Sequence, residues 1–326
     1  LESLNLSHSQ VEGDLEIFEN HPKLQLLDLE NVRVKGSIKV FGHTKNITLL
    51  KVNATFVQGD IAVFKKTPRL QELCLENAWN VKGNIYFENF AAVRSLRKLV
   101  ITNSKVAGFL FDSSFFKELQ EVSLERLPGF EVSLSAFERS TKLGKLIMKD
   151  VAVVGSIEPL PTSLAELNIG PLIPKEVEGN IRVFSDFRDL EVLSLEKTNV
   201  SGDLRSLSDL RLRVLNLACS NVEGNTHDLQ TSGTRFLNLA HVRRLSGTID
   251  ILNGTLTHIH VMNLEGTSVD GDLQVLEEAK GLKELHVAST RIVGDITVLK
   301  HATELRVINI TETAISGDIK VFQPMR

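Results

Sequence analysis

The sequence is poor in the features that mark disulfide-rich, membrane-spanning and nucleic-acid-binding proteins. Its 326 residues include two cysteines, one tryptophan and one tyrosine, and its formal net charge is -4. Because this charge gives no basic surface to hold a phosphate backbone, nucleic acid is not expected as a partner. No apolar run is long enough to span a bilayer, and the first residues lack the charged and apolar regions of a signal peptide. Membrane association is therefore expected only through flanking segments outside this sequence.

The sequence also lacks the short motifs of common catalytic and cofactor sites. It contains no H-E-x-x-H, C-x-x-C, G-x-S-x-G, G-x-G-x-x-G or P-loop motif. Catalysis requires a constellation of reactive groups that converge in one pocket. We therefore predict that the chain is not an enzyme and that it holds no cofactor and no metal.

The dominant feature of the sequence is a repeated segment, most often 23 residues long. The clearest copy, LKELHVASTRIVGDITVLKHATE, begins at Leu282, and its pattern is L-x-x-L-x-L-x-x-T-x-V-x-G-D-I-x-V-[FL]. Fourteen copies begin at Leu1, Leu24, Ile47, Leu70, Leu96, Leu119, Leu143, Leu164, Leu190, Leu212, Thr234, Ile259, Leu282 and Leu305. A fixed period in this range predicts a solenoid, in which each repeat buries its apolar face against its neighbours.

Alternating apolar residues predict two short extended segments in each repeat. In L-x-x-L-x-L the last two leucines point to one face of a strand, and these strands stack into a parallel sheet whose other face meets solvent. In V-x-G-D-I-x-V we expect a second extended segment, with a glycine such as Gly294 where the chain approaches its neighbour. One bulky residue per repeat would then stack into an internal spine, formed by Phe18, Phe41, Phe64, Phe87, Phe184 and Phe322, with Leu207, Leu276 and Leu299 elsewhere.

These motifs resemble the leucine-rich repeat (LRR) proteins across essentially the whole chain. The extension [TSN]-x-V-x-G-x-I is most similar to the plant-type subclass, and the G-D-I variant is similar to arrays of algal LRR proteins. Threonine replaces the usual asparagine of the plant-type repeat at Thr55, Thr198, Thr267, Thr290 and Thr313. Its hydroxyl can satisfy the same backbone groups of the turn, more weakly. The resemblance implies a right-handed, curved solenoid with a continuous parallel β-sheet on its concave face and little helix on its convex side.

The repeats predict one elongated domain over residues 1-326, with an irregular middle at about 119-177. Five of the eight prolines fall in this middle part, at Pro128, Pro159, Pro161, Pro171 and Pro174, and we expect them in loops or at edges. The insertion GPLIPKEVEG follows the strand that begins near Leu164. Drift in a tolerant array and a loop shaped for a partner both explain it. Because the terminal repeats are among the best copies, we expect this chain to be part of a longer protein.

Two rows of polar residues contain side chains that can serve as metal ligands. A carboxylate or amide follows the repeat glycine at Asp14, Asp60, Asp203, Asp272, Asp295 and Asp318, and at Asn84, Asn180 and Asn225. Such a ladder could bridge calcium, but side chains that accept hydrogen bonds from turn amides explain it better. His241, His260 and His286 are placed on three successive strands, at different positions along each, which does not favour a shared metal.

The concave sheet carries the candidate binding site. At the third position of the strand the chain has Val192, Val214, Phe236 and Val261 in consecutive repeats, and Val307 two repeats later. An amide row flanks them at Asn216, Asn238 and Asn263, and His260 lies beside it. Farther toward the N-terminus the same surface is acidic, with Glu72, Glu76, Glu121 and Glu125. An apolar stripe with a polar rim is typical of a protein or peptide interface, although β-branched residues also suit any sheet.

The compartment stays open at the level of sequence. Cys74 and Cys219 lie about six repeats apart, roughly 30 Å at one strand spacing per repeat, so they cannot form a disulfide. Free thiols favour a reducing, intracellular compartment. Six N-x-[ST] sequons, at Asn5, Asn46, Asn53, Asn199, Asn253 and Asn309, favour a secreted or cell-surface protein if they carry glycans. A repeat rich in Asn, Ser and Thr also produces such triplets by chance.

The leading hypothesis is a non-catalytic, receptor-like module that recognises a protein or peptide on its concave sheet. One alternative is a structural scaffold subunit of a larger assembly. The other is carbohydrate binding at a cell surface, for which the sequence offers one tryptophan, Trp79, and one tyrosine, Tyr86, as aromatic platforms.

Overall fold

The computed structural model describes residues 1-86, 92-111, 116-170, 176-229, 233-252 and 258-323. The chain forms two compact units. The first comprises Leu1–Leu164 with Ile169–Glu176, and the second comprises Ala165–Asn168 with Val177–Arg326. Both are built from the same repeat, and each repeat contributes one strand to an inner parallel sheet.

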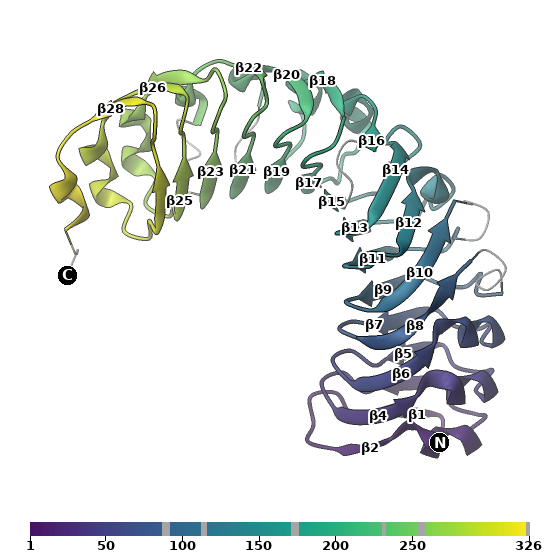
Figure 1. The fold of residues 1–326 in the computed structure, drawn as a ribbon. Helices are drawn as coiled ribbons and strands as arrows, with labels where there is room; N and C mark the ends of the chain where they lie inside the picture. Colours follow the sequence, from purple (N-terminus) through teal and green to yellow (C-terminus); the bar gives the residue numbers. More distant parts are fainter. Residues whose placement is uncertain (87–91, 112–115, 171–175, 230–232, 253–257, 324–326) are drawn as a thin grey trace. The chain divides into compact units, whose positions relative to one another are not determined.

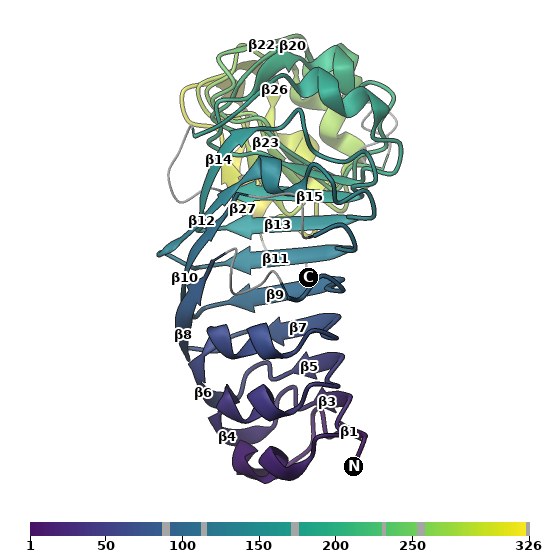
Figure 2. The ribbon, with the colours of Figure 1, turned by 90° about the vertical axis from the view of Figure 1, so that its right-hand side faces the viewer.

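The inner sheet of the first unit runs in sequence order. Its strands are β1 (Ser3–Asn5), β3 (Leu26–Asp28), β5 (Leu49–Lys51), β7 (Glu72–Leu75), β9 (Lys98–Thr102), β11 (Glu121–Glu125) and β13 (Lys145–Lys149). A lateral parallel sheet is formed by β2 (Glu12–Asp14), β4 (Arg33–Ser37), β6 (Phe56–Asp60), β8 (Asn80–Ile85), β10 (Lys105–Leu110), β12 (Phe130–Ser133) and β14 (Ala152–Ser156). Among its described residues, short 3-10 helices close four repeats: η1 (Leu15–Asn20), η2 (Ile38–His43), η3 (Ile61–Lys66) and η4 (Leu134–Phe137). Figure 2 shows the inner strands stacked with their arrows pointing the same way.

The second unit repeats this plan with shorter strands. Its inner strands are β15 (Glu166–Gly170), β17 (Val192–Ser194), β19 (Val214–Asn216), β21 (Phe236–Asn238), β23 (Val261–Asn263), β25 (Glu284–His286) and β27 (Val307–Asn309). The lateral strands are β16 (Val177–Glu178), β18 (Ser201–Asp203), β20 (Asn221–Asn225), β22 (Arg244–Ser246), β24 (Asp270–Asp272), β26 (Arg291–Asp295) and β28 (Ala314–Ser316). The 3-10 helices are η5 (Ile181–Asp186), η6 (Leu204–Leu207), η7 (Thr226–Asp228), η8 (Ile249–Leu252), η9 (Leu273–Glu278), η10 (Ile296–His301) and η11 (Ile319–Phe322). In Figure 1, β17, β19, β21 and β23 follow the inner edge of an arc, and β18, β20 and β22 follow its outer edge.

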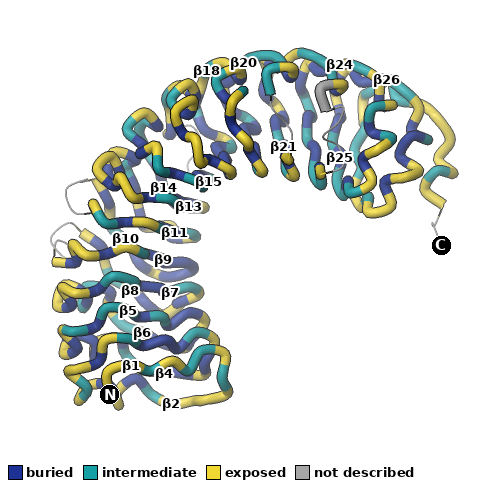
Figure 3. Tube along the Cα trace, turned by 180° about the vertical axis from the view of Figure 1, so that it is seen from behind, coloured by how far each residue is buried: buried dark blue, intermediate teal, exposed yellow. Residues whose placement is uncertain are grey.

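Burial alternates along the inner strands as the repeat predicts. In β25, Leu285 is completely buried, whereas Glu284 and His286 on either side are half-buried. Figure 3 shows this alternation as changes of colour along the tube. The architecture is therefore a parallel solenoid of short strands with only short 3-10 helices among the described residues, as the LRR resemblance implies.

The predicted extended segment over V-x-G-D-I-x-V is wrong in its second half. In the repeat from Leu282 the chain is extended only over Arg291–Asp295, and Ile296–His301 is a 3-10 helix. The Asp295 carboxylate accepts a hydrogen bond from the Thr297 N–H at 2.8 Å, which caps the helix start. The same cap is made by Asp14, Asp60, Asp203, Asp272, Asp318, Asn180 and Asn225. The carboxylates that follow the repeat glycine thus accept hydrogen bonds from turn amides, as the sequence predicts.

The predicted spine lies in these 3-10 helices. Phe41, Phe64 and Phe184 are completely buried, and Phe18 is nearly so. Leucines take the same place at Leu207, Leu276 and Leu299, each 1% exposed. Phe322 in the last repeat is 41% exposed, and Phe87 lies outside the described residues.

The repeat glycine couples each repeat to the one before it. Gly294 has φ +120°, and a Cβ built there would lie 2.5 Å from Oδ1 of Asp272, the cap of the preceding repeat. A side chain would meet both a clash and a backbone conformation that L residues rarely adopt. Gly13, at the same place in the first repeat, has no atom within 4 Å of a built Cβ. Glycine is therefore required at this position wherever the capping side chain of the preceding repeat packs against it.

The repeat threonines satisfy a turn carbonyl, as expected for a substitute of asparagine. The Thr290 hydroxyl donates to the Val287 carbonyl at 2.6 Å, and Thr290 is buried. Equivalent bonds are made by Thr55, Thr198, Thr267 and Thr313.

The irregular middle keeps the repeat's elements where it is described. The repeat from Leu119 has an inner strand, a lateral strand and a 3-10 helix despite its altered motif. Pro128, Pro159 and Pro161 lie outside the strands. Pro171, Pro174 and half of the insertion GPLIPKEVEG fall outside the described residues. No helix in the described ranges is long and apolar enough to cross a membrane.

Candidate interaction surface on the concave sheet

The apolar residues singled out from the sequence form one row across the inner sheet of the second unit. Strand register places Val192 beside Val214, Val214 beside Phe236, and Phe236 beside Val261. The row continues through Glu284 to Val307. At one strand spacing of about 4.8 Å per repeat, the four apolar residues span roughly 14 Å.

The members of this apolar row differ in how much surface they offer. Val192 is only 6% exposed and is flanked in register by Glu166 and Val214, so it adds little surface. Val214, Phe236 and Val261 are half-buried, and Val307 is 43% exposed. The accessible centre of the row is therefore Phe236 with its two valine neighbours.

The amide row lies parallel to the apolar row, two residues farther along each strand. Asn216, Asn238 and Asn263 stand in register. Their side-chain oxygens accept hydrogen bonds from the backbone N–H two residues on, at 3.3, 3.2 and 3.1 Å. The oxygens thus close local turns, and the Nδ2 of Asn216 donates to Glu196 at 3.1 Å. Within the described chain the Nδ2 groups of Asn238 and Asn263 donate to no protein acceptor, so this row offers donors to a partner.

The three histidines are not equivalent. His260 is half-buried directly before β23, and His286 ends β25 with its Nε2 3.7 Å from a Glu284 carboxylate oxygen. The placement of His241 on a strand is wrong: it lies in the turn after β21 with φ +57°. In the described ranges no three His, Cys, Asp or Glu side chains gather closely enough to hold a metal ion.

A third row on this surface was missed from the sequence. The residues at the second position of the repeat, one before each inner strand, are basic in five consecutive repeats: Arg213, Arg235, His260, Lys283 and Arg306. We call them the basic row. The signal in the sequence is the charge at the second repeat position, which is basic in each of these five consecutive repeats.

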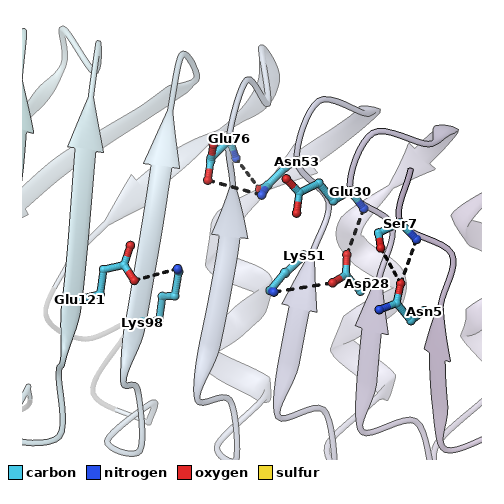
Figure 4. Close-up of polar contacts among 9 residues, drawn as sticks. All are labelled: Asn5, Ser7, Asp28, Glu30, Lys51, Asn53, Glu76, Lys98 and Glu121. Atoms are coloured by element: carbon cyan, nitrogen blue, oxygen red, sulfur yellow. Dashed lines mark hydrogen bonds and ion pairs between the residues drawn. The ribbon is translucent and has the colours of Figure 1, made fainter. Parts of the chain in front are cut away.

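The inner sheet of the first unit carries polar groups that satisfy one another (Figure 4). The Nζ of Lys98 lies 2.7 Å from Oε2 of Glu121, and the Nζ of Lys51 lies 3.6 Å from Oδ2 of Asp28. The Asn53 side-chain oxygen accepts the Glu76 N–H at 2.9 Å. Partial burial, reinforced by neighbouring glutamates, raises the pKa of the Glu76 carboxyl. Of the glutamates predicted for this surface, Glu121 is paired with Lys98, whereas Glu76 lies among carboxylates that repel its charge.

One aromatic cluster lies away from the concave sheet, on the lateral side of the first unit. Tyr86 packs against Phe109 with ring centroids 5.1 Å apart, and Phe109 packs against Phe111 at 5.2 Å. All three are substantially exposed. Phe111 takes the repeat position that Tyr86 holds in the preceding repeat, and Phe109 takes the position of the usual Asp or Asn, so an alignment of these two repeats could have found the cluster.

Comparison with known proteins identifies the fold. No protein-family model matches the sequence, and no curated protein matches it by sequence comparison. Among solved structures, the plant peptide hormone receptor RGFR1 in complex with RGF2 matches with 23% identity and a TM-score of 0.73, over 98% of this chain and 52% of that chain. The LRR ectodomain of the Arabidopsis thaliana receptor kinase GASSHO1/SCHENGEN3, in complex with CASPARIAN STRIP INTEGRITY FACTOR 2, matches with 20% identity and a TM-score of 0.77, over 99% and 40%. The PEPR1–AtPEP1 structure matches with 20% identity and a TM-score of 0.76, over 98% and 49%.

These matches show that the chain has the fold of a leucine-rich repeat solenoid. It spans between 40% and 52% of the length of these three chains.

Proposed function

We propose that this chain is a non-catalytic module that binds an extended protein or peptide segment across the inner strands β17 to β27 of the second unit. The observation that carries the proposal is the alignment of Val214, Phe236 and Val261, which are half-exposed in one row and bordered by donor amides. Apolar groups with hydrogen-bonding neighbours are the usual composition of a binding patch. The structural neighbours include a plant peptide hormone receptor and a receptor kinase ectodomain in complex with a peptide hormone ligand, which supports the same class of ligand.

We further propose that the module works outside the cell. The neighbours include the ectodomain of a plant membrane receptor kinase. Of the sequons, Asn5 is exposed, whereas Asn53 is 5% exposed and hydrogen-bonded to Glu76. Glycans would therefore be carried selectively and not at Asn53. The sequon at Asn253 lies outside the described residues.

A selection experiment tests the binding function without a known partner. A displayed library of random peptides about twelve residues long would be selected on the immobilised chain, since about twelve extended residues span roughly 40 Å and exceed the length of the site. Peptides that emerge would be measured against the Phe236→Ala variant. We expect a loss of binding free energy of about 1 to 3 kcal/mol, or roughly 5- to 150-fold in Kd.

The matched control is Phe56→Ala, which removes a ring that is 68% exposed on β6 of the first unit. It should leave peptide binding unchanged. Retention of full affinity by the Phe236→Ala variant, with hydrogen-exchange protection appearing elsewhere in the chain, would refute the proposed site.

A further inference from the structure

We infer that the bound segment is acidic, with carboxylates that lie along the basic row while its apolar side chains contact the apolar row at Val214, Phe236 and Val261. This inference rests on the proposed function and specifies its ligand. The basic row comprises Arg213, Arg235, His260, Lys283 and Arg306, which directly precede Val214, Phe236, Val261, Glu284 and Val307.

Backbone hydrogen bonds hold the basic row in strict register. The N–H of Arg235 donates to the carbonyl of Arg213 at 2.9 Å, and the N–H of His260 donates to the carbonyl of Arg235 at 2.8 Å. The same bond joins Lys283 to His260 and Arg306 to Lys283, each at 2.8 Å. With about 4.8 Å per step, the row runs roughly 19 Å, the length of about six extended residues.

Most of the charge in this row is uncompensated by the chain itself. Lys283 has an ion pair with Glu304 at 3.4 Å. Arg213, Arg235 and Arg306 are exposed, and across the described residues none of them has an ion pair. Arg213 and Arg235 hold the same position in neighbouring repeats and repel one another, and an anionic partner relieves that repulsion. A guanidinium also matches the planar geometry of a carboxylate.

The amide row, on the other side of the apolar row, also favours a partner rich in hydrogen-bond acceptors. Asn238 and Asn263 have their oxygens engaged in turns and present N–H groups. Both borders therefore supply donors, and a ligand must supply acceptors. Carboxylates also occur near this surface: Glu191 precedes the basic row, Glu166 and Glu284 stand in register with the apolar row, and Glu196 and Glu265 follow the amide row. Glu284 already lies near His286, and Glu196 near Asn216.

The choice of an acidic peptide over a nucleic acid follows from the position of the apolar stripe. Phe236 lies one residue from Arg235, so a ligand on the row must also cover an apolar surface. Nucleic-acid bases stack on aromatic faces, and the row offers only the one ring of Phe236 between valines, whereas a peptide can alternate carboxylates with aliphatic groups.

The test uses the peptides selected on the wild-type chain and two variants of equal charge. In the first variant, Arg213, Arg235 and Arg306 are each changed to Gln. In the control, three exposed arginines of the second unit outside the concave sheet, Arg182, Arg188 and Arg291, are each changed to Gln. We expect selected peptides to be enriched in Asp and Glu over the input library. Their Kd should rise about tenfold or more in the first variant, with a weaker dependence on salt, and stay unchanged in the control.

The outcomes separate this inference from the proposed function. Peptides that need Phe236 but show no acidic enrichment, or that bind both triple variants equally, would overturn the acidic ligand and leave the binding site standing. Peptides that bind independently of Phe236, or no selected peptides at all, would overturn both.

Discussion

Substitution of a single glycine tests how the repeats are joined. In the Gly294→Ala variant, the new Cβ would sit 2.5 Å from Oδ1 of Asp272 and 3.0 Å from the Leu273 nitrogen, in a backbone with φ +120°. Forcing an L residue into this conformation costs about 1 to 3 kcal/mol. Displacing the Asp272 carboxylate also weakens the cap of η9, where it accepts the Gln274 N–H at 2.8 Å, at a cost of about 1 kcal/mol. The expected loss of unfolding free energy is therefore about 2 to 4 kcal/mol.

The assay combines urea unfolding with hydrogen exchange. Because each repeat contacts mainly its neighbours, faster exchange should be confined to the repeats around η9 and β26, with the first unit unaffected. Gly13→Ala is the control, since no atom lies within 4 Å of its built Cβ and its φ is not positive. That change should be neutral or slightly stabilising, by up to about 1 kcal/mol.

A double variant sharpens the result. Asp272→Ala removes the atom that the new Cβ strikes, so combining it with Gly294→Ala should cost about 1 kcal/mol less than the sum of the single changes. Equal costs for Gly294→Ala and Gly13→Ala, or strict additivity in the double variant, would refute the coupling between cap and glycine.

Three further predictions concern other positions. Thr290→Val should lower the unfolding free energy by about 1 to 2 kcal/mol in urea titrations, because the buried Val287 carbonyl loses its 2.6 Å donor; an unchanged midpoint would contradict this. The pKa of Glu76 is raised in the folded protein, so the ionised carboxylate destabilises the fold above that pKa, and the penalty disappears once the carboxyl is protonated. Glu76→Gln should therefore raise the melting temperature at pH 7 and have little effect below pH 4.5, the ordinary pKa of a glutamate. Burial raises the pKa of Cys74 to about 12, so iodoacetamide at pH 8 should label the half-exposed Cys219 well before Cys74, as followed by mass spectrometry; equal rates in the folded protein would contradict the burial.

The fold could be predicted because the same repeat occurs fourteen times in the sequence. Repetition gives the period, the alternation gives the buried face, and the strand register then aligns equivalent residues such as Val214 and Phe236. The 3-10 helix was missed because I-x-V alternates like a strand. Its real signal is the spacing of three between Ile296 and Leu299, both buried, which is the period of a 3-10 helix that follows a capping Asp.

The candidate surface was predicted in outline and missed in detail. The positions of the apolar and amide rows follow from the repeat alone, but the low exposure of Val192 depends on its neighbours across the sheet. The turn hydrogen bonds of Asn238 and Asn263 depend on backbone geometry that no spacing encodes. The basic row could have been found, since charge at one repeat position needs only the alignment of the repeats.

The contact between a glycine and the preceding cap also determines how this array can change in length. If Leu282 to Glu304 were deleted as a whole, Gly317 would succeed Gly294 above Asp272, and the joint would have the same chemistry as before. On the inner sheet Val307 would then stand directly beside Val261, where Glu284 now separates them. The loss of one repeat would thus give an uninterrupted apolar row and remove Lys283, while the packing between repeats in the core would stay the same. Gain and loss of whole repeats can therefore change the binding specificity of this surface while the core packing stays the same.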